Sequence, residues 1–252
     1  MYRLRILSVF IVLGLIMSGA TASFSQEKAQ PSAERKADKR DSNSDAAPDS
    51  VNSWYSQAVS QGRAGINVTN FWSLNSLFRA ETVVGGHKII TIVTGSTYYA
   101  FDALAMNGVA IERSQRAIDA DDPDRRPFGN EIETMLAQGA EKVREEVVMG
   151  TPCDVYQVTD DAGRRVLWLS QGRWELPVRI EIYDRKTGER KHTDFLDWVN
   201  GLPIDEVFFV PDDSVVFEHY TLESYIEHSQ NVGPVGSVPV LYADLLHGRR
   251  KK

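Results

Sequence analysis

The sequence predicts an α+β domain built on one large antiparallel sheet of about 11 strands, curved, with helices on one side. Beyond residue 60, apolar residues recur with a period of two over two long stretches, as is typical of strands. Between the stretches, residues 119–124 read as an acidic loop and residues 127–138 as a helix that ends before Gly139. Strands and helices that are grouped rather than interleaved favour the α+β class.

The first stretch predicts a helix followed by about five strands. The helix is expected at residues 51–60, with Gly62 beyond its end. The strands are expected at residues 64–70, 77–84, 88–94, 97–102 and 109–113. Gly85-Gly86 and Gly95-Ser96 stand between neighbouring strands, where glycine accepts the positive φ of a tight hairpin turn. This stretch should therefore form an antiparallel meander.

The second stretch predicts about six further strands and a short helix. The strands are expected at residues 142–149, 154–160, 164–170, 178–184, 191–198 and 215–220, and the helix at residues 222–228. Residues 231–252 carry Gly-Pro-Val-Gly and a basic end, so we expect a loosely docked tail. The expected domain therefore spans residues 51–230.

The first 22 residues are typical of a secretory signal peptide. Arg3 and Arg5 precede an apolar core at residues 6–17, which is short for a membrane span, and Ala20 and Ala22 match a peptidase site. No cysteine stands near this site, so no lipid anchor is expected. We expect cleavage after Ala22 and a soluble periplasmic protein, the alternative being an uncleaved signal anchor.

Residues 23–50 should form a disordered linker, because from Ser25 onward alanine is their only hydrophobic residue type and charges of both signs alternate. Removing Arg3 and Arg5 from the 28 basic residues leaves 26 against 35 acidic ones, a net charge of −9 for the mature chain. Such an acidic chain is unsuited to bind nucleic acid. The lone Cys153 excludes an internal disulfide, and it is expected either to lie buried in a strand or to pair with another chain.

Enzymatic motifs are absent from the sequence. It contains no Gly-x-Ser-x-Gly, no His-Glu-x-x-His, no phosphate-binding glycine loop and no Cys-x-x-Cys. The five histidines follow no metal-ligand spacing, and Asp121, Asp122 and Asp124 lack the glycine of a calcium loop. We therefore expect no catalytic residues, no metal and no cofactor.

Several short motifs follow one another in an ordered series. They are Leu77-Phe-Arg79, Ile89-Ile-Thr-Ile-Val93, Gly95-Ser-Thr-Tyr-Tyr-Ala-Phe-Asp102, Val166-Leu-Trp-Leu169, Leu176-Pro-Val-Arg179, Phe195-Leu-Asp-Trp198 and Leu202-Pro-Ile-Asp-Glu-Val-Phe-Phe-Val-Pro211. The series resembles the LolA/LolB-like lipoprotein carriers and the broader outer-membrane lipoprotein-sorting proteins over residues 51–220. It departs from them at Thr94-Gly95, where the family often has Asp-Gly. The resemblance implies a half-barrel sheet with helices on its concave side and a hydrophobic cavity for acyl chains.

The strand patterns are compatible with a cavity, since residues 89–93 and 166–169 are apolar on both faces of their strands. In a half-exposed sheet one face of each strand would be polar. One interpretation is an ordinary core covered on both sides; the other is a concave face partly open to a lipid tail. The candidate lining residues are Phe78, Ile90, Ile92, Tyr99, Phe101, Leu167, Leu169, Ile180 and Trp198.

Two arginines lie within the strand patterns. Arg79 and Arg179 each stand two residues before a glutamate, Glu81 and Glu181, so that each pair shares one face of its strand and predicts a surface ion pair. In the resembling carriers an arginine of the Phe-Arg strand helps to close the cavity. Arg79 occupies the matching place and is the candidate gate.

These observations predict a monomeric, non-enzymatic binding protein of the periplasm. Its ligand would be a lipid, a lipoprotein acyl chain or a similar amphiphile, which it carries or senses. The main alternative is a structural or regulatory module that binds an envelope protein and has no ligand cavity. A third alternative is a hydrolase whose site the motifs do not reveal.

Overall fold

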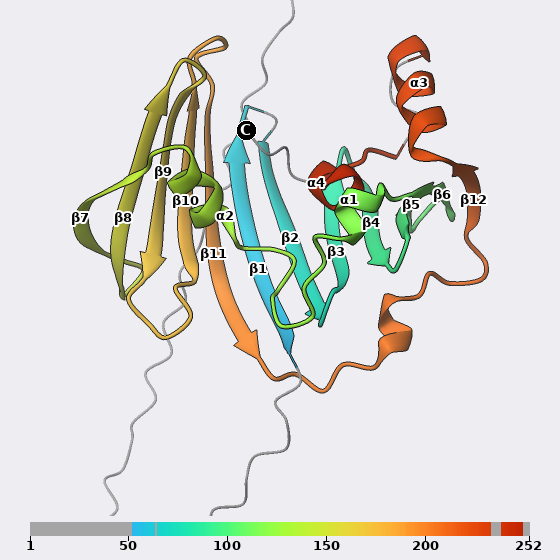
Figure 1. Ribbon diagram of the computed structural model, residues 1–252, viewed down its shortest axis with the longest axis horizontal. Coiled ribbons are helices and arrows are strands. Elements are labelled where there is room, and N and C mark those ends of the chain that lie inside the picture. Colours follow the sequence, from blue (N-terminus) through green and yellow to red (C-terminus); the bar gives the residue numbers. More distant parts are fainter. Residues whose placement is uncertain (1–51, 64, 233–237, 249–252) are drawn as a thin grey trace, which may run out of the picture. The chain divides into compact units, whose positions relative to one another are not determined.

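In the computed structural model, which describes residues 52–63, 65–232 and 238–248, the strands form one open sheet (Figure 1). The strands are β1 (Ser53–Gly62), β2 (Gly65–Leu74), β3 (Leu77–Val84), β4 (His87–Thr94), β5 (Thr97–Asp102), β6 (Asn107–Glu112), β7 (Glu141–Val148), β8 (Thr151–Asp160), β9 (Gly163–Ser170), β10 (Pro177–Asp184), β11 (Arg190–Asn200) and β12 (Val216–Tyr220). Their order is β12-β6-β5-β4-β3-β2-β1-β11-β10-β9-β8-β7. The expected curved α+β half-barrel is confirmed, although it has 12 strands rather than about 11.

Short helices complete the part of the chain that the structure describes. They are α1 (Gln115–Ile118), α2 (Glu131–Ala137), α3 (Leu222–Val232), α4 (Ala243–His247) and the 3-10 turn η1 (Glu206–Phe209). Helices α1, α2 and α4 lie on the concave side of the sheet, which we call the inner face (Figure 1). The strap, residues 201–215, includes η1 and crosses the opposite, outer face against β3 and β4.

Strand β1 corrects one expectation, because residues 51–60 do not form a helix. This strand joins the two halves of the sheet by pairing with β2 on one side and β11 on the other. Trp54, Ser56 and Ala58 alternate as buried side chains, so the strand does have a period of two. Serine and alanine carry little of the apolar pattern that marks a strand in sequence, and pairing on both edges overrides local propensity.

Other local expectations are confirmed or corrected by the backbone. Gly85 and Gly95 have positive φ angles of 59° and 54° in the turns between β3 and β4 and between β4 and β5, as predicted. Helix α2 begins four residues later than expected, because residues 126–130 form a turn in which Gly129 has a φ of 71°. Strand β12 exists as expected but pairs with β6 in parallel, which makes the sheet mixed.

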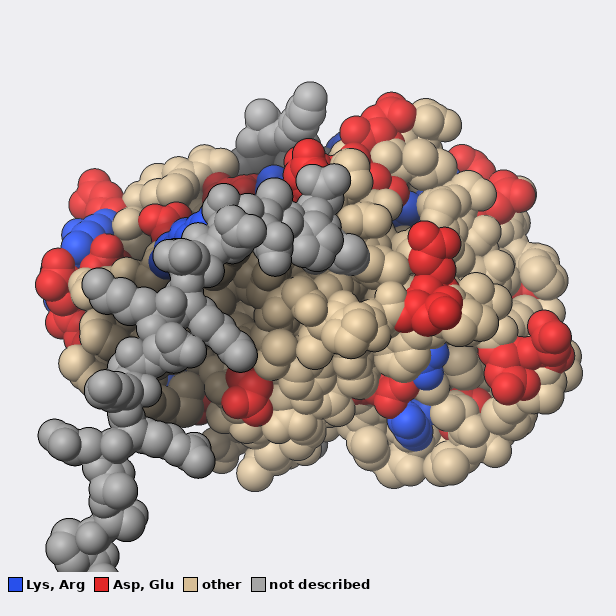
Figure 2. All heavy atoms as spheres, turned by 90° about the horizontal axis from the view of Figure 1, so that it is seen from below, with Lys and Arg blue, Asp and Glu red and all other residues tan. Residues whose placement is uncertain are grey.

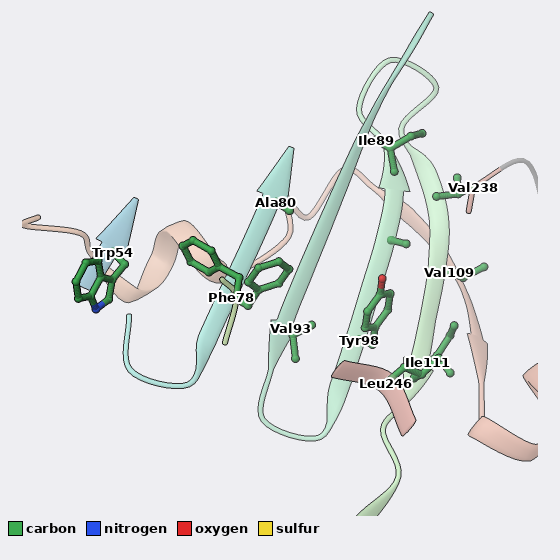
Figure 3. Close-up of a cluster of buried hydrophobic side chains, with 12 residues drawn as sticks. Trp54, Phe78, Ala80, Ile89, Val93, Tyr98, Val109, Ile111, Val238 and Leu246 are labelled. Carbon is green, nitrogen blue, oxygen red and sulfur yellow. The ribbon is translucent and has the colours of Figure 1, made fainter. Parts of the chain in front are cut away.

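The inner face of the first half carries the largest buried cluster (Figure 3). Its members come from β1, β3 to β6, the turn before α2 and the C-terminal segment: Trp54, Phe78, Ala80, Ile89, Val93, Tyr98, Ala100, Val109, Ile111, Phe128, Val238 and Leu246. Phe78 lies opposite Val93, and Val93 opposite Tyr98, so three adjacent strands contribute neighbouring side chains. Burial of such side chains is the main source of stability for the sheet.

The outer face of the first half is also apolar, and the strap covers it. Its buried residues are Leu74, Ile90, Ile92, Phe101, Phe209 and Val215. Phe209 from η1 is fully buried, and the ring centroids of Phe208 and Trp72 are 5.4 Å apart. The double-sided apolar pattern of β4 is therefore explained by two covers, the C-terminal segment inside and the strap outside.

The second half of the sheet carries one cluster on each face. One cluster joins Met135 of α2 to Ala140, Val158, Leu167 and Leu169. The other cluster holds Val148, Cys153, Val155, Val166, Trp168 and Val178. Cys153 is fully buried in β8, which confirms the buried alternative. Burial raises the pKa of its thiol, so its reactive thiolate form is disfavoured.

The C-terminal segment is part of the core, so the expectation of a loosely docked tail is wrong for residues 238–248. Leu246 is 1% exposed and Val238 is 3% exposed. Arg113 Nε donates to the Leu245 carbonyl at 2.7 Å, and the Tyr242 amide donates to the Tyr98 hydroxyl at 3.2 Å. The segment thus closes over strands that precede it by more than 100 residues.

The expected signal peptide at residues 1–22 and the linker at residues 23–50 lie outside the described residues. Their boundaries stay predictions. Within the described ranges, no helix has the length and apolar character needed to span a membrane.

Tyr98 makes the stability of the fold dependent on alkaline pH. Its side chain is fully buried, and this burial raises its pKa from 10.0 to about 12. Above pH 10 the unfolded chain releases this proton more readily than the folded one, so stability falls with pH until the folded pKa is reached. We expect the free energy of unfolding to fall by about 1.4 kcal/mol per pH unit from Tyr98 over this window.

Denaturant melts from pH 9 upward test this expectation on the wild type and Tyr98→Phe. The variant should be less stable at pH 9, because it lacks the hydroxyl that accepts a hydrogen bond from the Tyr242 amide. It should nevertheless lose less stability as pH rises, because it has no phenol at position 98 to ionise. Equal slopes in both proteins would show that Tyr98 does not control the alkaline transition.

Candidate functional site

A cavity of about 1200 Å³ opens on the inner face. Its floor is formed by the sheet, one wall by residues 113–138 and the other by residues 241–248. The apolar residues of its lining are Phe71, Phe78, Ala117, Ala120, Pro127, Phe128, Met135, Ile180, Ile182, Phe195, Leu241, Tyr242, Ala243 and Leu245. Ligand pockets of roughly 300–1,000 Å³ are usual for small molecules. This cavity is therefore large enough for a ligand with a long alkyl chain.

Aromatic rings form a continuous ladder beside the cavity. Phe128 stacks on Phe71, with ring centroids 5.2 Å apart, and on Trp198, with centroids 5.6 Å apart. Tyr242 meets Phe78 edge to face at 5.1 Å. Such pairs add about 0.5–1.5 kcal/mol each beyond the area they bury. The ladder therefore links the turn before α2 and the C-terminal segment to the sheet.

The lining also holds charged side chains, including five arginines. Arg113 pairs with Asp121, Arg125 with Glu133 and Arg165 with Asp160, while Arg116 donates to the Gly248 carbonyl. Arg113 is almost fully buried and uses all its nitrogens, because it also donates to carbonyls of Gly95, Ala117 and Leu245. Arg113 thus joins the two walls of the cavity where α1 and α4 meet.

Arg126 is the remaining arginine. Its Cζ lies 5.2 Å from the ring centroids of both Trp54 and Trp198. Its Nε donates to the Phe128 carbonyl and its Nη2 to the Gly129 carbonyl, at 3.1 and 3.0 Å. Burial lowers the pKa of its guanidinium, which nevertheless stays charged at neutral pH.

Five of the nine predicted lining residues lie on the inner side of the sheet. Phe78 and Ile180 line the cavity itself. Trp198 lies behind Phe128 in the aromatic ladder. Leu167 and Leu169 are buried in the cluster that includes α2 and form part of the core. The structure therefore brings only part of the predicted set to the cavity.

The other four predicted residues, Ile90, Ile92, Tyr99 and Phe101, lie on the outer face in the cluster that includes the strap, where the rings of Tyr99 and Phe101 meet Phe217 of β12. The strand register explains the division: Phe78 is opposite Val93, so its neighbour Ile92 projects to the other side of the sheet. Ile92 is fully buried there. These residues line no part of the described cavity.

Arg79, the candidate gate, also lies on the outer face. Its Nη2 pairs with Glu81 Oε1 at 2.7 Å, which confirms the predicted partner, but both side chains are only 16% exposed, so the pair is largely covered rather than on the surface. Its Nη1 donates to the Phe208 carbonyl at 2.9 Å, and its Cζ lies 4.4 Å from the ring centroid of Phe208. In this structure Arg79 therefore holds the strap in place and does not border the cavity.

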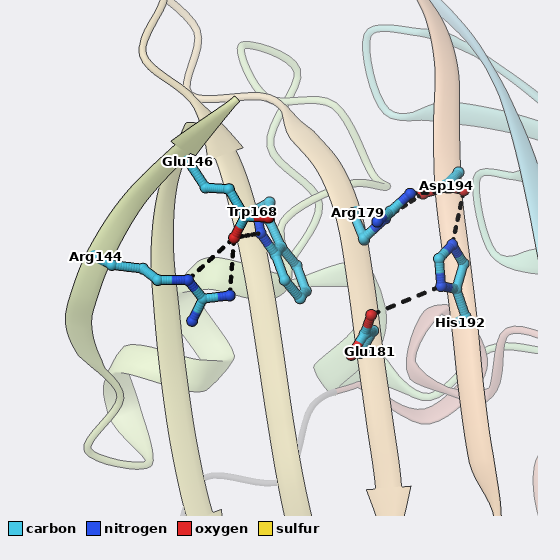
Figure 4. Close-up of polar contacts among 7 residues, drawn as sticks. All are labelled: Arg144, Glu146, Trp168, Arg179, Glu181, His192 and Asp194. Carbon is cyan, nitrogen blue, oxygen red and sulfur yellow. Dashed lines mark hydrogen bonds and ion pairs between the residues drawn. The ribbon is translucent and has the colours of Figure 1, made fainter. Parts of the chain in front are cut away.

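Arg179 belongs to a polar network on β10 and β11 (Figure 4). It pairs with Asp194 at 2.7 Å rather than with Glu181, which corrects the expected pair. Burial opposes ionisation of Asp194, but hydrogen bonds from Arg179 and His192 hold the pKa of its carboxyl below the usual value. Glu181 Oε1 lies 3.8 Å from His192 Nδ1. Each charge in this network has a partner, so it serves to join the two strands.

Where the described residues form the surface in Figure 2, its charged side chains are mostly acidic. The acidic side chains lie in separate groups. The basic side chains do not form a continuous stripe. This distribution agrees with the net acidic composition.

The sequence alone does not predict which segments form most of the cavity walls. Residues 119–124 read as a solvated acidic loop and residues 241–248 as part of a tail, although both segments line the cavity. One signal is present: Leu241, Tyr242, Leu245 and Leu246 repeat at the spacing of an apolar helix face. The proximity of these two segments depends on tertiary structure that no local pattern encodes.

Comparison with protein-family models finds no match, and comparison with curated proteins finds none either. Solved structures do show similarity. An uncharacterized conserved protein from Thermus thermophilus is 13% identical, with 67% of this chain and 91% of that chain covered and a TM-score of 0.47. The structure of the Pseudomonas aeruginosa MucA/MucB complex is 17% identical, with 65% of this chain and 56% of that chain covered and a TM-score of 0.40.

A putative outer membrane lipoprotein-sorting protein domain from Vibrio parahaemolyticus is also similar. It is 13% identical, 63% of this chain and 89% of that chain are covered, and the TM-score is 0.32. A lipoprotein-sorting protein domain is thus among the solved structures to which this chain is similar.

Gly129 tests how closely the turn before α2 fits against the aromatic ladder. A Cβ at this position would lie 2.5 Å from Trp198 Cη2, and the φ of 71° is itself unfavourable for alanine. We expect Gly129→Ala to cost roughly 1–2 kcal/mol for the backbone and about 1–3 kcal/mol more for displacing the indole, measured by denaturant melts.

Gly139→Ala is the matched control, since Gly139 has a φ of 85° but no atom within 4 Å of its added Cβ. It should show the backbone cost alone and leave tryptophan fluorescence unchanged. Equal destabilisation of the two variants would contradict the tight contact between Gly129 and Trp198.

Proposed function

We propose that this protein is an exported binding protein of the cell envelope that holds an amphiphile in the inner-face cavity, as a carrier or a sensor. The observation that carries the proposal is the cavity of about 1200 Å³, with an apolar sheet floor and an aromatic wall. The same class is implied by the motifs that resemble lipoprotein carriers. No catalytic step is part of the proposal.

The physical basis is the burial of an alkyl chain. Phe71, Ile180 and Ile182 on the floor line the cavity and are partly or fully exposed, so they present apolar surface to it. Each methylene that leaves water for such surroundings contributes about 0.8 kcal/mol. A single long chain therefore provides enough energy for micromolar binding after the cost of association is subtracted.

Binding of a neutral, long-chain probe tests the proposal directly. Pyrenedecanol carries no charge, so its fluorescence on titration reports on the apolar cavity alone. Ile182 lines the cavity and is 40% exposed, so tryptophan at this position occupies cavity space without entering the core. We expect Ile182→Trp to weaken probe binding by about tenfold or more, which corresponds to about 1.4 kcal/mol.

Ile66→Trp is the matched control, because Ile66 is 67% exposed on another strand and lies outside the cavity. It should bind the probe like the wild type. If the wild type takes up no probe, or if both tryptophan variants bind equally well, the cavity is not a ligand site. A protein-interaction module of the envelope would then be the better interpretation.

A further inference from the structure

Arg126 differs from the other arginines that line the cavity. Three of those have a carboxylate partner, and Arg116 is exposed. Arg126 is half-buried and, within the described residues, makes no ion pair or hydrogen bond with a carboxylate. A cation that has lost part of its hydration without gaining an anionic partner is the group in a site that gains most from an anion.

The geometry around Arg126 keeps part of its guanidinium available. Nε and Nη2 donate to backbone carbonyls, and the indoles of Trp54 and Trp198 hold the group between them. Nη1 has no acceptor among the described residues, yet it is not one of the buried polar atoms without a partner. Nη1 is therefore accessible, on a side chain that lines the cavity.

The net charge of the whole lining does not favour an anionic ligand over a neutral one. Its five arginines are balanced by five carboxylates, Asp119, Asp121, Asp122, Glu131 and Asp244. Selectivity must come from a local contact. Burial has the largest effect on the pKa of Arg126 and lowers it, and the charge of Arg125 lowers it too, whereas the charges of Glu131 and Glu133 raise it through space. The nearest ring neighbours of its guanidinium, Trp54 and Trp198, carry no charge, and Pro127 and Phe128, which follow Arg126 in sequence, are uncharged members of the same lining.

We propose that Arg126 binds the anionic head group of the amphiphile, so that the cavity selects long-chain acids over neutral chains of equal length. The inference rests on the proposed function of the cavity and specifies its ligand class. A carboxylate and an alkyl phosphate both match the planar donor fork of arginine. The aromatic and apolar residues would bury the chain while Nη1 donates to the head group.

Two probes that differ only in the head group test this inference. Pyrenedecanoate and pyrenedecanol carry the same chain and fluorophore, so the ratio of their affinities isolates the effect of the charge. We expect the wild type to bind the acid at least about tenfold more tightly than the alcohol, as a charge-assisted hydrogen bond provides. Arg126→Met should abolish this preference and leave the affinity for the alcohol within about twofold of the wild type.

Arg116→Met is the control for the loss of one positive charge at the cavity, since Arg116 also lines it but is exposed. This variant should keep the preference for the acid. Arg126→Lys retains the charge without the fork and should keep part of the preference, which separates a role in binding from a role in folding. Competition by dodecanoate and by dodecyl phosphate then identifies the preferred head group.

The outcomes separate the two proposals. Uptake of the alcohol without preference for the acid, or a preference that persists in Arg126→Met, would overturn the role of Arg126 but leave the cavity intact as a binding site. Failure of the wild type to bind either probe would overturn the proposed function itself.

Discussion

Strand β4 is apolar on both of its faces, and the rest of the architecture follows from the need to cover each one. Ile89 and Val93 project to the inner face, and Ile90 and Ile92 to the outer face. An antiparallel sheet can leave one polar face in water, but this strand has no polar face to leave. The strap therefore covers the outside, while the helices and the C-terminal segment cover the inside. The outer cover is in close contact, whereas the inner one leaves the cavity.

The two covers explain which predictions from sequence succeed. The sheet is predicted from local patterns, namely the hairpin glycines Gly85 and Gly95 and the alternating apolar runs. Such patterns suffice because turns and strands depend largely on residues that are neighbours in sequence. The division of lining residues is different: where both phases of a strand are apolar, as in Ile89 to Val93, composition does not tell which phase faces inward. Only the register with β3 and β5 decides that Phe78 and Ile92 lie on opposite faces. Strand β1 is not predicted by the sequence for a related reason, since its buried Ser56 and Ala58 carry little of the apolar pattern that marks a strand.

Long-range polar contacts hold the inner cover and thereby shape the cavity. Arg113 joins β6 to the loop after α1 and to the segment before Leu246, across more than 130 residues of sequence. Each of its nitrogens donates to an acceptor, and these hydrogen bonds offset the cost of removing the guanidinium from water. Arg126, on the same wall, has only carbonyl and aromatic partners. This contrast between a satisfied and an incompletely satisfied cation distinguishes a structural arginine from one available to a ligand.

Quenching of tryptophan fluorescence by a chain-brominated fatty acid tests most directly whether the inner-face cavity holds an amphiphile. Two variants are needed, one retaining only Trp198 and one only Trp72, with the other tryptophans replaced by phenylalanine. Trp198 lies behind the cavity wall on Phe128, whereas Trp72 packs against Phe208 on the outer face. A bound chain should quench Trp198 with saturation while leaving Trp72 largely unquenched. Equal quenching of both tryptophans, or quenching of Trp72 alone, would contradict the account by placing the chain outside the cavity.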